Sequence, residues 1–367
     1  MIGLDKCTRS GLDNLSFWDK SHNLKEDYRA KTVMGYSGKE KSISTKQVRI
    51  ILDAMLKKIN KGLKNAHDIK TGLYSSYFIN EPLKYKSEKG KSRSIYKPLK
   101  FKQTPLPLFL EGIMHGLSIA DSSAEAKKTY NAVKKSALYD KKLKMYKINA
   151  PLKSMPYEIG RIRVFTPGWL ENESIWLHME YKYMLSMLKS GLYSEFYKDL
   201  KHVLIPFNAP ELYGRSILEN SSFLASSAFP RKELHGKGFV ARLSGATAEF
   251  MHMWLIMCAG NNPFYLDKAG KLFLQLKPIL PGWLFSYKQE NGFAKNSFAF
   301  KFLGKTLVIY HNPKRKNTYG KNAVSCVSIT IKPFNKKAVM LQSSVIPPPF
   351  SRDIREGKIE RIEIILT

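Results

Sequence analysis

The residues best suited to chemistry gather within residues 160–249. A Pro-Gly turn at residues 167–168 leads an aromatic residue and two acids into the start of a predicted helix, where His178 lies about one and a half turns further along. Tryptophan rings can stack on the C–H faces of sugars, and a protonated histidine can bind an anion. A tryptophan within a core, or a histidine whose partners all lie inside the protein, would give the same pattern. The candidate sugar-binding residues of this group are Trp169, Glu171 and Trp176.

A second group lies in a predicted loop and combines two acids, an arginine and a tyrosine with amide and hydroxyl side chains. Sugar hydroxyls both donate and accept hydrogen bonds, so a sugar site needs such a mixture. A solvated loop with capping residues accounts for the composition equally well. The candidate sugar-binding residues of this loop are Glu211, Tyr213, Arg215 and Glu219.

A third group, residues 242–249, opens an apolar helix with small residues. The N–H groups in the first turn of a helix have no partner within the helix, and the helix dipole favours an anion beside them. The start of this helix is therefore a candidate site for phosphate or another anion. Ser244 could equally be a plain N-cap.

Several other chemistries have no motif in this sequence. The chain lacks a Walker A or GxGxxG fingerprint, an HExxH or paired CxxC motif, and a GxSxG elbow. Its three cysteines are scattered, which predicts neither a disulfide framework nor a metal site. No apolar run approaches the length of a membrane span, and the first ten residues lack the pattern of a signal peptide. We therefore expect a cytoplasmic protein with no membrane partner, metal or cofactor.

The net charge of +31 raises the alternative of a basic nucleic-acid-binding protein. The basic residues are spread along the chain, with no dense block beyond short pieces such as residues 314–316. Proteins that bind nucleic-acid phosphates usually concentrate basic and aromatic side chains on one element. A general drift of composition toward lysine is the simpler interpretation, so we do not expect nucleic acid as the partner.

The elements that must position these groups change type along the chain. Apolar spacing predicts an amphipathic helix near residues 45–63, after a loop over residues 1–43. A Lys-, Ser- and Pro-rich connection follows over residues 82–106, and a long loop covers residues 205–243. Further helices are predicted over residues 107–120, 122–136, 172–189, 194–203 and 244–259. Strands are predicted near residues 272–276, 298–302, 307–310, 327–331 and 359–364.

This order predicts a mainly α chain with a C-terminal all-β part. The helical part would cover residues 1–265 and hold the sugar and phosphate site, and the β-sheet domain would cover residues 266–367.

The three groups occur in an order that resembles cellobiose phosphorylase and its relatives, the inverting glycoside phosphorylases. The shared pieces are an ENxxxxxH helix opening at residues 171–178, a loop rich in Tyr and Glu, and a Ser-Gly-small-Thr-Ala helix opening at residues 244–248. The Trp-Leu-Glu-Asn-Glu-Ser-Ile-Trp-Leu-His and Leu-Glu-Asn-Ser-Ser stretches look closest to the large oligoglucan phosphorylase-like branch. The resemblance covers roughly residues 10–290.

The resemblance implies a portion of an (α/α)6 toroid followed by a small antiparallel β-sheet domain. It implies phosphorolysis of a β-glucoside or β-glucan to an α-sugar 1-phosphate, with inorganic phosphate as co-substrate held by His178, Ser244 and Gly245. Phosphate is already a nucleophile at neutral pH, so such a site needs one carboxylic acid and a cradle of cations and N–H groups. The general acid would be Asp13 or Asp19, in the stretch that best matches the family's Asp-Trp-Asn-Asp loop.

The family also has an N-terminal β-sandwich and a complete ring of paired helices, of which this sequence shows about half. We therefore expect an upstream-encoded N-terminal half as a partner, and an isolated chain that is inactive or nearly so. The alternatives are a non-catalytic remnant, a carbohydrate-binding piece, or the basic nucleic-acid-binding protein considered above.

Overall fold

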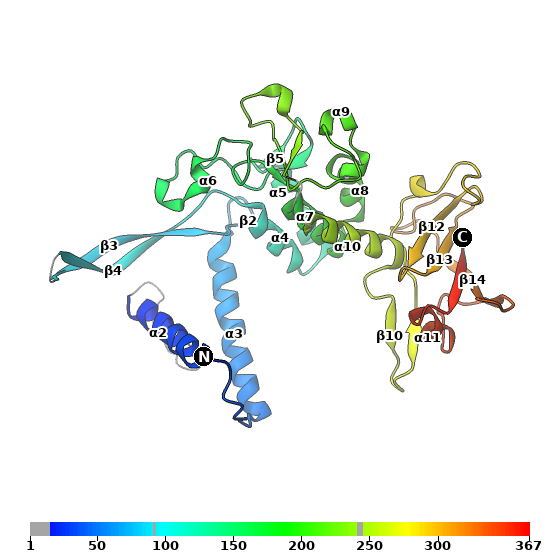
Figure 1. Cartoon of the computed structure of the whole chain (residues 1–367), viewed down its shortest axis with the longest axis horizontal. Coiled ribbons are helices and arrows are strands. Elements are labelled where there is room, and N and C mark those ends of the chain that lie inside the picture. The colour runs from blue at the N-terminus through cyan, green and yellow to red at the C-terminus, as the bar shows by residue number, and fades with distance from the viewer. Residues whose placement is uncertain (1–14, 91–92, 241–244) are drawn as a thin grey trace.

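A computed structural model describes residues 15–90, 93–240 and 245–367 of the chain. A helical body lies at the centre, two helices and a long hairpin project from it on the N-terminal side, and the C-terminal strands lie on the opposite side (Figure 1). Within these described residues, no helix is both long enough and apolar enough to cross a membrane.

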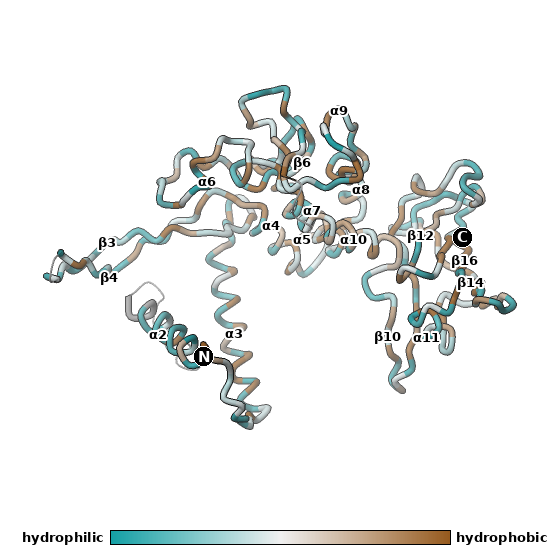
Figure 2. Tube along the Cα trace, viewed as in Figure 1, coloured by the Kyte–Doolittle hydropathy of each residue, from teal (hydrophilic) through white to brown (hydrophobic). Residues whose placement is uncertain are grey.

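The projecting elements are α2, α3 and the hairpin of β3 and β4. Helix α3 begins with a capping box, in which Ser44 and Gln47 satisfy each other's backbone N–H groups. None of its residues is buried, and hydrophobic residues recur along it although it stands free of the body (Figure 2). The bounds of these elements are Leu15–Thr32 for α2, Thr45–Ala66 for α3, Phe78–Lys89 for β3 and Ser94–Pro105 for β4.

Two expectations for this region were wrong. Residues 15–32 form a helix where a loop was expected, and residues 82–106 belong largely to a hairpin where a connection was expected. The connection was expected because of its Lys, Ser and Pro content. Apolar and polar residues nevertheless alternate in pieces such as Leu83-Lys84-Tyr85-Lys86, which suits an exposed strand.

The central body is built around α7, which contacts α4, α8 and α10. Ten residues of α7 are buried, among them Tyr181, Tyr183 and Leu188, because a helix surrounded by others must be apolar on most sides. The helices of the body are α4 (Leu110–Ser118), α5 (Ser123–Lys135), α7 (Leu177–Lys189), α8 (Tyr193–Val203) and α10 (Gly245–Ala259).

Short elements join these helices and bring distant segments to α7. A three-stranded sheet pairs β7 with β8 and β8 with β9, so the segment after residue 204 returns to the start of α7. These strands are β7 (Ile175–Trp176), β8 (Phe223–Leu224) and β9 (Gly238–Phe239). The others are β1 (His67–Asp68), β2 (Leu73–Tyr74), β5 (Tyr139–Asp140), β6 (Met145–Tyr146), η1 (Tyr157–Ile159), α6 (Arg161–Val164), η2 (Ile205–Phe207), α9 (Pro210–Tyr213) and η3 (Lys232–Leu234).

The C-terminal strands form a five-stranded sheet in the order β12-β13-β16-β14-β15. The sheet is mixed rather than antiparallel, because β13 and β16 pair in parallel while the other neighbours are antiparallel. Its strands are β12 (Ser297–Phe302), β13 (Thr306–His311), β14 (Cys326–Pro333), β15 (Val339–Leu341) and β16 (Ile359–Leu366). A separate pair, β10 (Phe264–Leu266) with β11 (Leu272–Leu274), precedes it, and η4 (Gly282–Leu284) and α11 (Phe350–Arg355) lie between strands.

The expected fold class therefore needs correction. Helix α11 lies within the part that was expected to be all-β, β3 and β4 lie within the part that was expected to be helical, and the described residues form no barrel. The chain has a mixed α/β fold. One continuous hydrophobic core joins the helices to the sheet, and the Tyr310 hydroxyl donates to the carbonyl of Cys258 at 2.7 Å across this junction.

Candidate functional site

The side chain of His178 lies against the start of α10. A Cβ atom built on Gly245, the first residue of α10, would lie 2.5 Å from His178 Nδ1, which is closer than real Cβ atoms come to other atoms. Only glycine therefore lets the imidazole approach the first turn of this helix so closely. The two segments are 67 positions apart in sequence, and the packing of α7 on α10 brings them together.

Two charged residues lie close to the imidazole. Glu249 Oε1 is 3.6 Å from His178 Nε2, which is an electrostatic contact rather than a hydrogen bond. Lys182 follows His178 by one helical turn on α7. Burial lowers the pKa of His178, the Lys182 charge lowers it further, and Glu249 opposes both. The free imidazole is therefore mostly neutral at pH 7.

The first turn of α10 is also tied to the loop that precedes β8. Asn220 donates from Nδ2 to Thr247 Oγ1 at 3.2 Å, and its side-chain Oδ1 accepts from the Tyr181 hydroxyl at 3.3 Å. The same hydroxyl accepts from the Ile205 N–H at 3.2 Å. These bonds join α7, α10 and the loop around His178. A helix start, an imidazole and an ammonium are groups that can bind an oxyanion, whereas the Glu249 carboxylate repels one.

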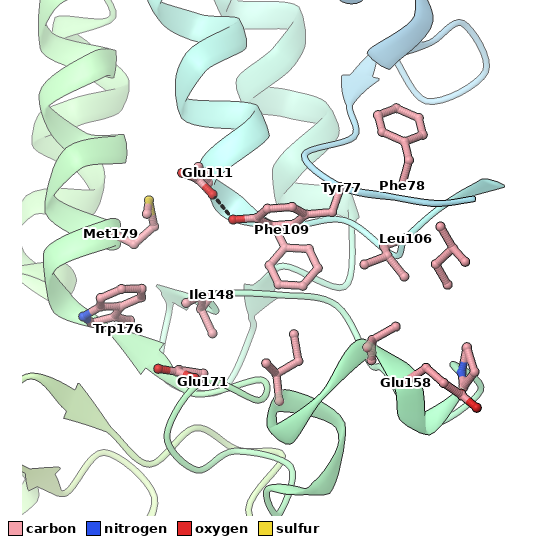
Figure 3. Close-up of a pocket in the computed structure, with 14 residues that line it drawn as sticks. Tyr77, Phe78, Leu106, Phe109, Glu111, Ile148, Glu158, Glu171, Trp176 and Met179 are labelled. Atoms are coloured by element: carbon pink, nitrogen blue, oxygen red, sulfur yellow. Dashed lines mark hydrogen bonds between the residues drawn. The ribbon is translucent and has the colours of Figure 1, made fainter. Parts of the chain in front are cut away.

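A cavity of about 530 Å³ lies next to this cluster, between the start of α7 and the root of the β3–β4 hairpin (Figure 3). Aromatic and aliphatic side chains line most of it, and three carboxylates, those of Glu111, Glu158 and Glu171, also line it. Its volume lies within the range of about 300–1,000 Å³ that is usual for small-molecule sites. Aromatic rings with a few polar groups suit a sugar, which presents C–H faces and hydroxyls.

Two of the expected sugar-binding residues, Trp176 and Glu171, line this cavity together. Trp176 stands edge-on to His178, with ring centroids 6.2 Å apart, so the cavity adjoins the imidazole. Its indole Nε1 is buried and has no partner among the described residues. Arg161 donates two hydrogen bonds to the Glu171 carboxylate, at 3.0 and 3.2 Å.

The opposite part of the cavity contains a tyrosine–carboxylate pair. The Tyr77 hydroxyl donates to Glu111 Oε2, and this bond, with burial and the carboxylate charge, raises the pKa of Tyr77 to about 12. The Tyr77 ring also meets Phe109 edge-on, with centroids 4.9 Å apart. Tyr77 therefore remains a neutral phenol at all ordinary pH values.

The structure places Trp169 elsewhere. Its ring stacks on Phe239 with centroids 3.6 Å apart and planes 4° apart, and Phe229 lies 5.2 Å away. These contacts are those of a packing residue, and Trp169 does not line the cavity. Phe239 therefore occupies one face of the Trp169 ring, and a sugar-stacking role for Trp169 stays a prediction.

The loop candidates are likewise not brought to His178 or to the cavity. Tyr213 is fully buried and its hydroxyl donates to the carbonyl of Glu219 at 2.7 Å, so it stabilises the loop. Arg215 and Glu219 are a short-range ion pair that spans one turn of this loop. Glu211 is exposed and lines a different cavity. The alternative interpretation of this segment was a solvated loop with capping residues, and these local contacts agree with that alternative.

The remaining candidates lie at the edge of the described residues. Asp13 and Ser244 fall outside them. Asp19 is exposed on α2, a helix that lies apart from α7 and α10 (Figure 1). Among the described residues, no three His, Cys, Asp or Glu side chains are grouped as metal ligands would be.

Sequence reasoning missed several residues of the site. Lys182 follows His178 at the i+4 spacing of a helix face, which could have identified it. Asn220 lies within a stretch that was noted, but nothing local predicts its bond to Thr247. Tyr77 and Phe109 reach the cavity from segments that carry no sequence signal for binding.

Comparisons with known proteins add no assignment. The chain matches no protein-family model, and no curated protein matches it.

Proposed function

We propose that this chain is part of a carbohydrate-active enzyme of the inverting glycoside phosphorylase type, and that it carries the phosphate-binding side of the site. The observation that carries the proposal is the imidazole of His178 packed on Gly245 at the start of α10. The order of motifs that resembles the cellobiose phosphorylases supports the same function. The reaction would convert a β-glucoside or β-glucan to an α-sugar 1-phosphate.

In this reaction a phosphate oxygen attacks the anomeric carbon from the face opposite the glycosidic oxygen. The bond to the leaving sugar breaks, a carboxylic acid gives that sugar's oxygen its proton, and the configuration inverts. Phosphate would lie between His178, the first-turn N–H groups of α10 and Lys182. Its negative charge would raise the pKa of His178 and favour the protonated, doubly donating imidazole.

The sugar would occupy the adjacent cavity, where Trp176 offers a ring next to His178 and Glu171 offers carboxylate oxygens. The general acid is not assigned by this geometry, because α2, which carries Asp19, lies apart from the cluster. We propose that the helices around α7 belong to an (α/α)6 toroid completed by a further polypeptide segment. The free apolar face of α3 supports this, since a helix of a closed ring has neighbours on that face.

Radiolabelled phosphate tests the reaction. The chain is incubated with cello-, laminari- and sophoro-oligosaccharides, and labelled sugar phosphate is sought; the anomeric configuration of the product is then determined by NMR. We expect slow, phosphate-dependent formation of an α-sugar 1-phosphate that Gly245→Ala abolishes. The matched control is Gly62→Ala, at a helical glycine with open space around it.

Product formation that survives Gly245→Ala would contradict the assigned phosphate site. A chain that neither binds phosphate nor forms product would contradict the function itself.

A second candidate, nucleic-acid binding, is favoured by the β3–β4 hairpin. Lysines face each other across its register at Lys86–Lys97, where Glu88 pairs with both at 3.7 and 3.0 Å, and at Lys84–Lys100. Tyr85 and Tyr96, next to Lys86 and Lys97 in sequence, are exposed with ring centroids 5.5 Å apart. Basic groups with interleaved aromatic rings suit a single strand of nucleic acid.

Fluorescence anisotropy with a labelled oligonucleotide distinguishes the two candidates. If the hairpin binds nucleic acid, replacing these four lysines with Gln weakens binding and reduces its dependence on salt. Equal affinity of the two proteins would exclude the hairpin as the binding element.

A further inference from the structure

A second cavity of about 570 Å³ lies beside α8 and α9 and shares no lining residue with the cavity next to His178. Three segments surround it: the turn between β5 and β6, the end of α8 with α9, and the region of η3. Four lysines line it, and they are Lys142, Lys144, Lys232 and Lys237.

The lining has an excess of positive charge. Against the four lysines stand two glutamates, Glu211 and Glu233, so the lysine and glutamate side chains leave two positive charges unbalanced. Glu233 is also engaged by Arg231 at 2.7 Å, outside the cavity lining. The excess of positive charge is therefore at least two, and a ligand with two negative charges would offset most of it.

One of the lysines is held by a buried histidine. His235 is 7% exposed, and its Nδ1 lies 2.8 Å from Lys142 Nζ. Its Nε2 lies 2.7 Å from the carbonyl oxygen of Phe229. The carbonyl requires an N–H at Nε2, so Nδ1 accepts from the ammonium.

The turn that carries Lys142 is itself fixed. Buried Asp140 accepts hydrogen bonds from the N–H groups of Lys142, Leu143 and Ser227. Asp140 thus fixes the backbone of the turn, and His235 contacts the ammonium of Lys142, whose side chain is exposed.

A second lysine occupies a strained backbone position. Lys144 has φ of 57°, in the left-handed region that glycine and asparagine adopt more readily. A side chain there costs about 1 kcal/mol, and such strain is concentrated at functional sites. Lys144 lies close enough to His202, another lining residue, to lower its pKa, in addition to the larger effect of burial.

We propose that this cavity binds a phosphomonoester of metabolite size. A phosphomonoester carries close to two negative charges at pH 7, which matches the excess charge of the lining. The side chains of Leu143 and Leu212 give the organic part of the ligand an apolar contact. A nucleic acid is the poorer fit, because it needs a row of cations along an extended backbone rather than a cluster in one cavity.

Isothermal titration with glucose 6-phosphate tests the proposal, in a Gly245→Ala background that removes the proposed phosphate site at His178. The double variant Lys144→Gln with Lys232→Gln should lose about tenfold or more in affinity, since two charge-assisted contacts disappear. The matched control, Lys268→Gln with Lys314→Gln, removes the same charge from exposed positions outside this cavity and should bind as before.

A third variant excludes a general defect of folding. Lys144→Asn places a residue that tolerates the left-handed region at that position, so it should unfold at the same or higher urea concentration and still bind more weakly. The absence of saturable binding in the Gly245→Ala parent would overturn the proposal. Equal losses in the double variant and its control, or tighter binding of inorganic phosphate than of the ester, would overturn it as well.

Discussion

At the scale of single residues, the anion site that we propose depends on glycine at position 245. Any larger residue would displace the imidazole of His178 from the first turn of α10. Glu249 and Lys182 then influence the same imidazole with opposite charges. The site therefore depends on the contact between two helices and not on either motif alone.

Glu180, two residues beyond His178, is a buried carboxyl with a defined structural consequence. It is fully buried, its Oε1 accepts from the Tyr146 N–H at 2.7 Å, and its Oε2 has no partner among the described residues. Burial raises the pKa of Glu180 well above its usual value, and the charges of Asp199 and Asp140 raise it further. The hydrogen bond from the Tyr146 N–H and the charge of Lys134 lower it, but by less.

This raised pKa makes the stability of the chain depend on pH. A pKa that is raised in the folded state gives stability that is present below the unfolded pKa and is lost as the pH rises through the folded pKa. Glutamine does not titrate, so the Glu180→Gln variant does not lose stability in this way. We therefore expect the free energy of unfolding of the variant, relative to that of the natural chain, to increase between about pH 5 and about pH 8. Urea denaturation at both pH values measures it, and an advantage that does not change with pH would contradict the account.

At the scale of elements, sequence periodicity predicted α3, the five helices of the body and four strands of the C-terminal sheet, but not how the strands pair. The helix expected over residues 194–203 is α8, and the strand expected near residues 359–364 is β16. The parallel pairing of β13 with β16 was not predictable, since it depends on α11 and the long connection between them. The exposed hairpin of β3 and β4 was missed because no buried face gives it a strong pattern.

The candidate site was predictable only in part. The resemblance implied that His178 and Gly245 lie close together, and the structure places the imidazole against Gly245. The loop around Tyr213 looked polar enough for a sugar, but its hydroxyl and acids are used in local bonds. Which polar group remains free for a ligand depends on tertiary contacts, and a linear pattern does not contain them.

The β3–β4 hairpin should be dispensable for the stability of the body. Most of its residues are exposed, so replacing residues 82–101 with an Asn-Gly turn removes little buried surface. We expect the free energy of unfolding to change by less than about 0.5 kcal/mol, as for surface changes generally. A clearly lower urea midpoint would show that the hairpin packs on the body.

At the scale of the whole molecule, the free apolar face of α3 is the main departure from an ordinary soluble surface. Leu52, Met55 and Ile59 are about half exposed on a helix without buried residues. A contiguous apolar patch of this kind marks an interaction surface or an aggregation risk. The toroid in our proposal places another helix against this face.

Replacing these three residues with Ser should therefore change association and not folding. We expect the natural chain to form larger species as its concentration rises, and the triple variant to remain smaller at the same concentration. Light scattering coupled to gel filtration measures this, with unfolding in urea as the check on stability. Two proteins with the same concentration-independent mass would contradict the inference that α3 is an interaction surface.

Calorimetric titration of inorganic phosphate tests the central claim, the phosphate site at His178, most directly. The experiment uses the Lys144→Gln, Lys232→Gln background, so that the second basic cavity does not contribute. His178→Ala should lower the affinity about 10- to 100-fold, because a hydrogen bond to a charged group contributes about 1.5–3 kcal/mol. His252→Ala, which removes an exposed histidine from α10, should leave the affinity unchanged. Phosphate binding that is equally tight with and without the His178 imidazole would contradict the account.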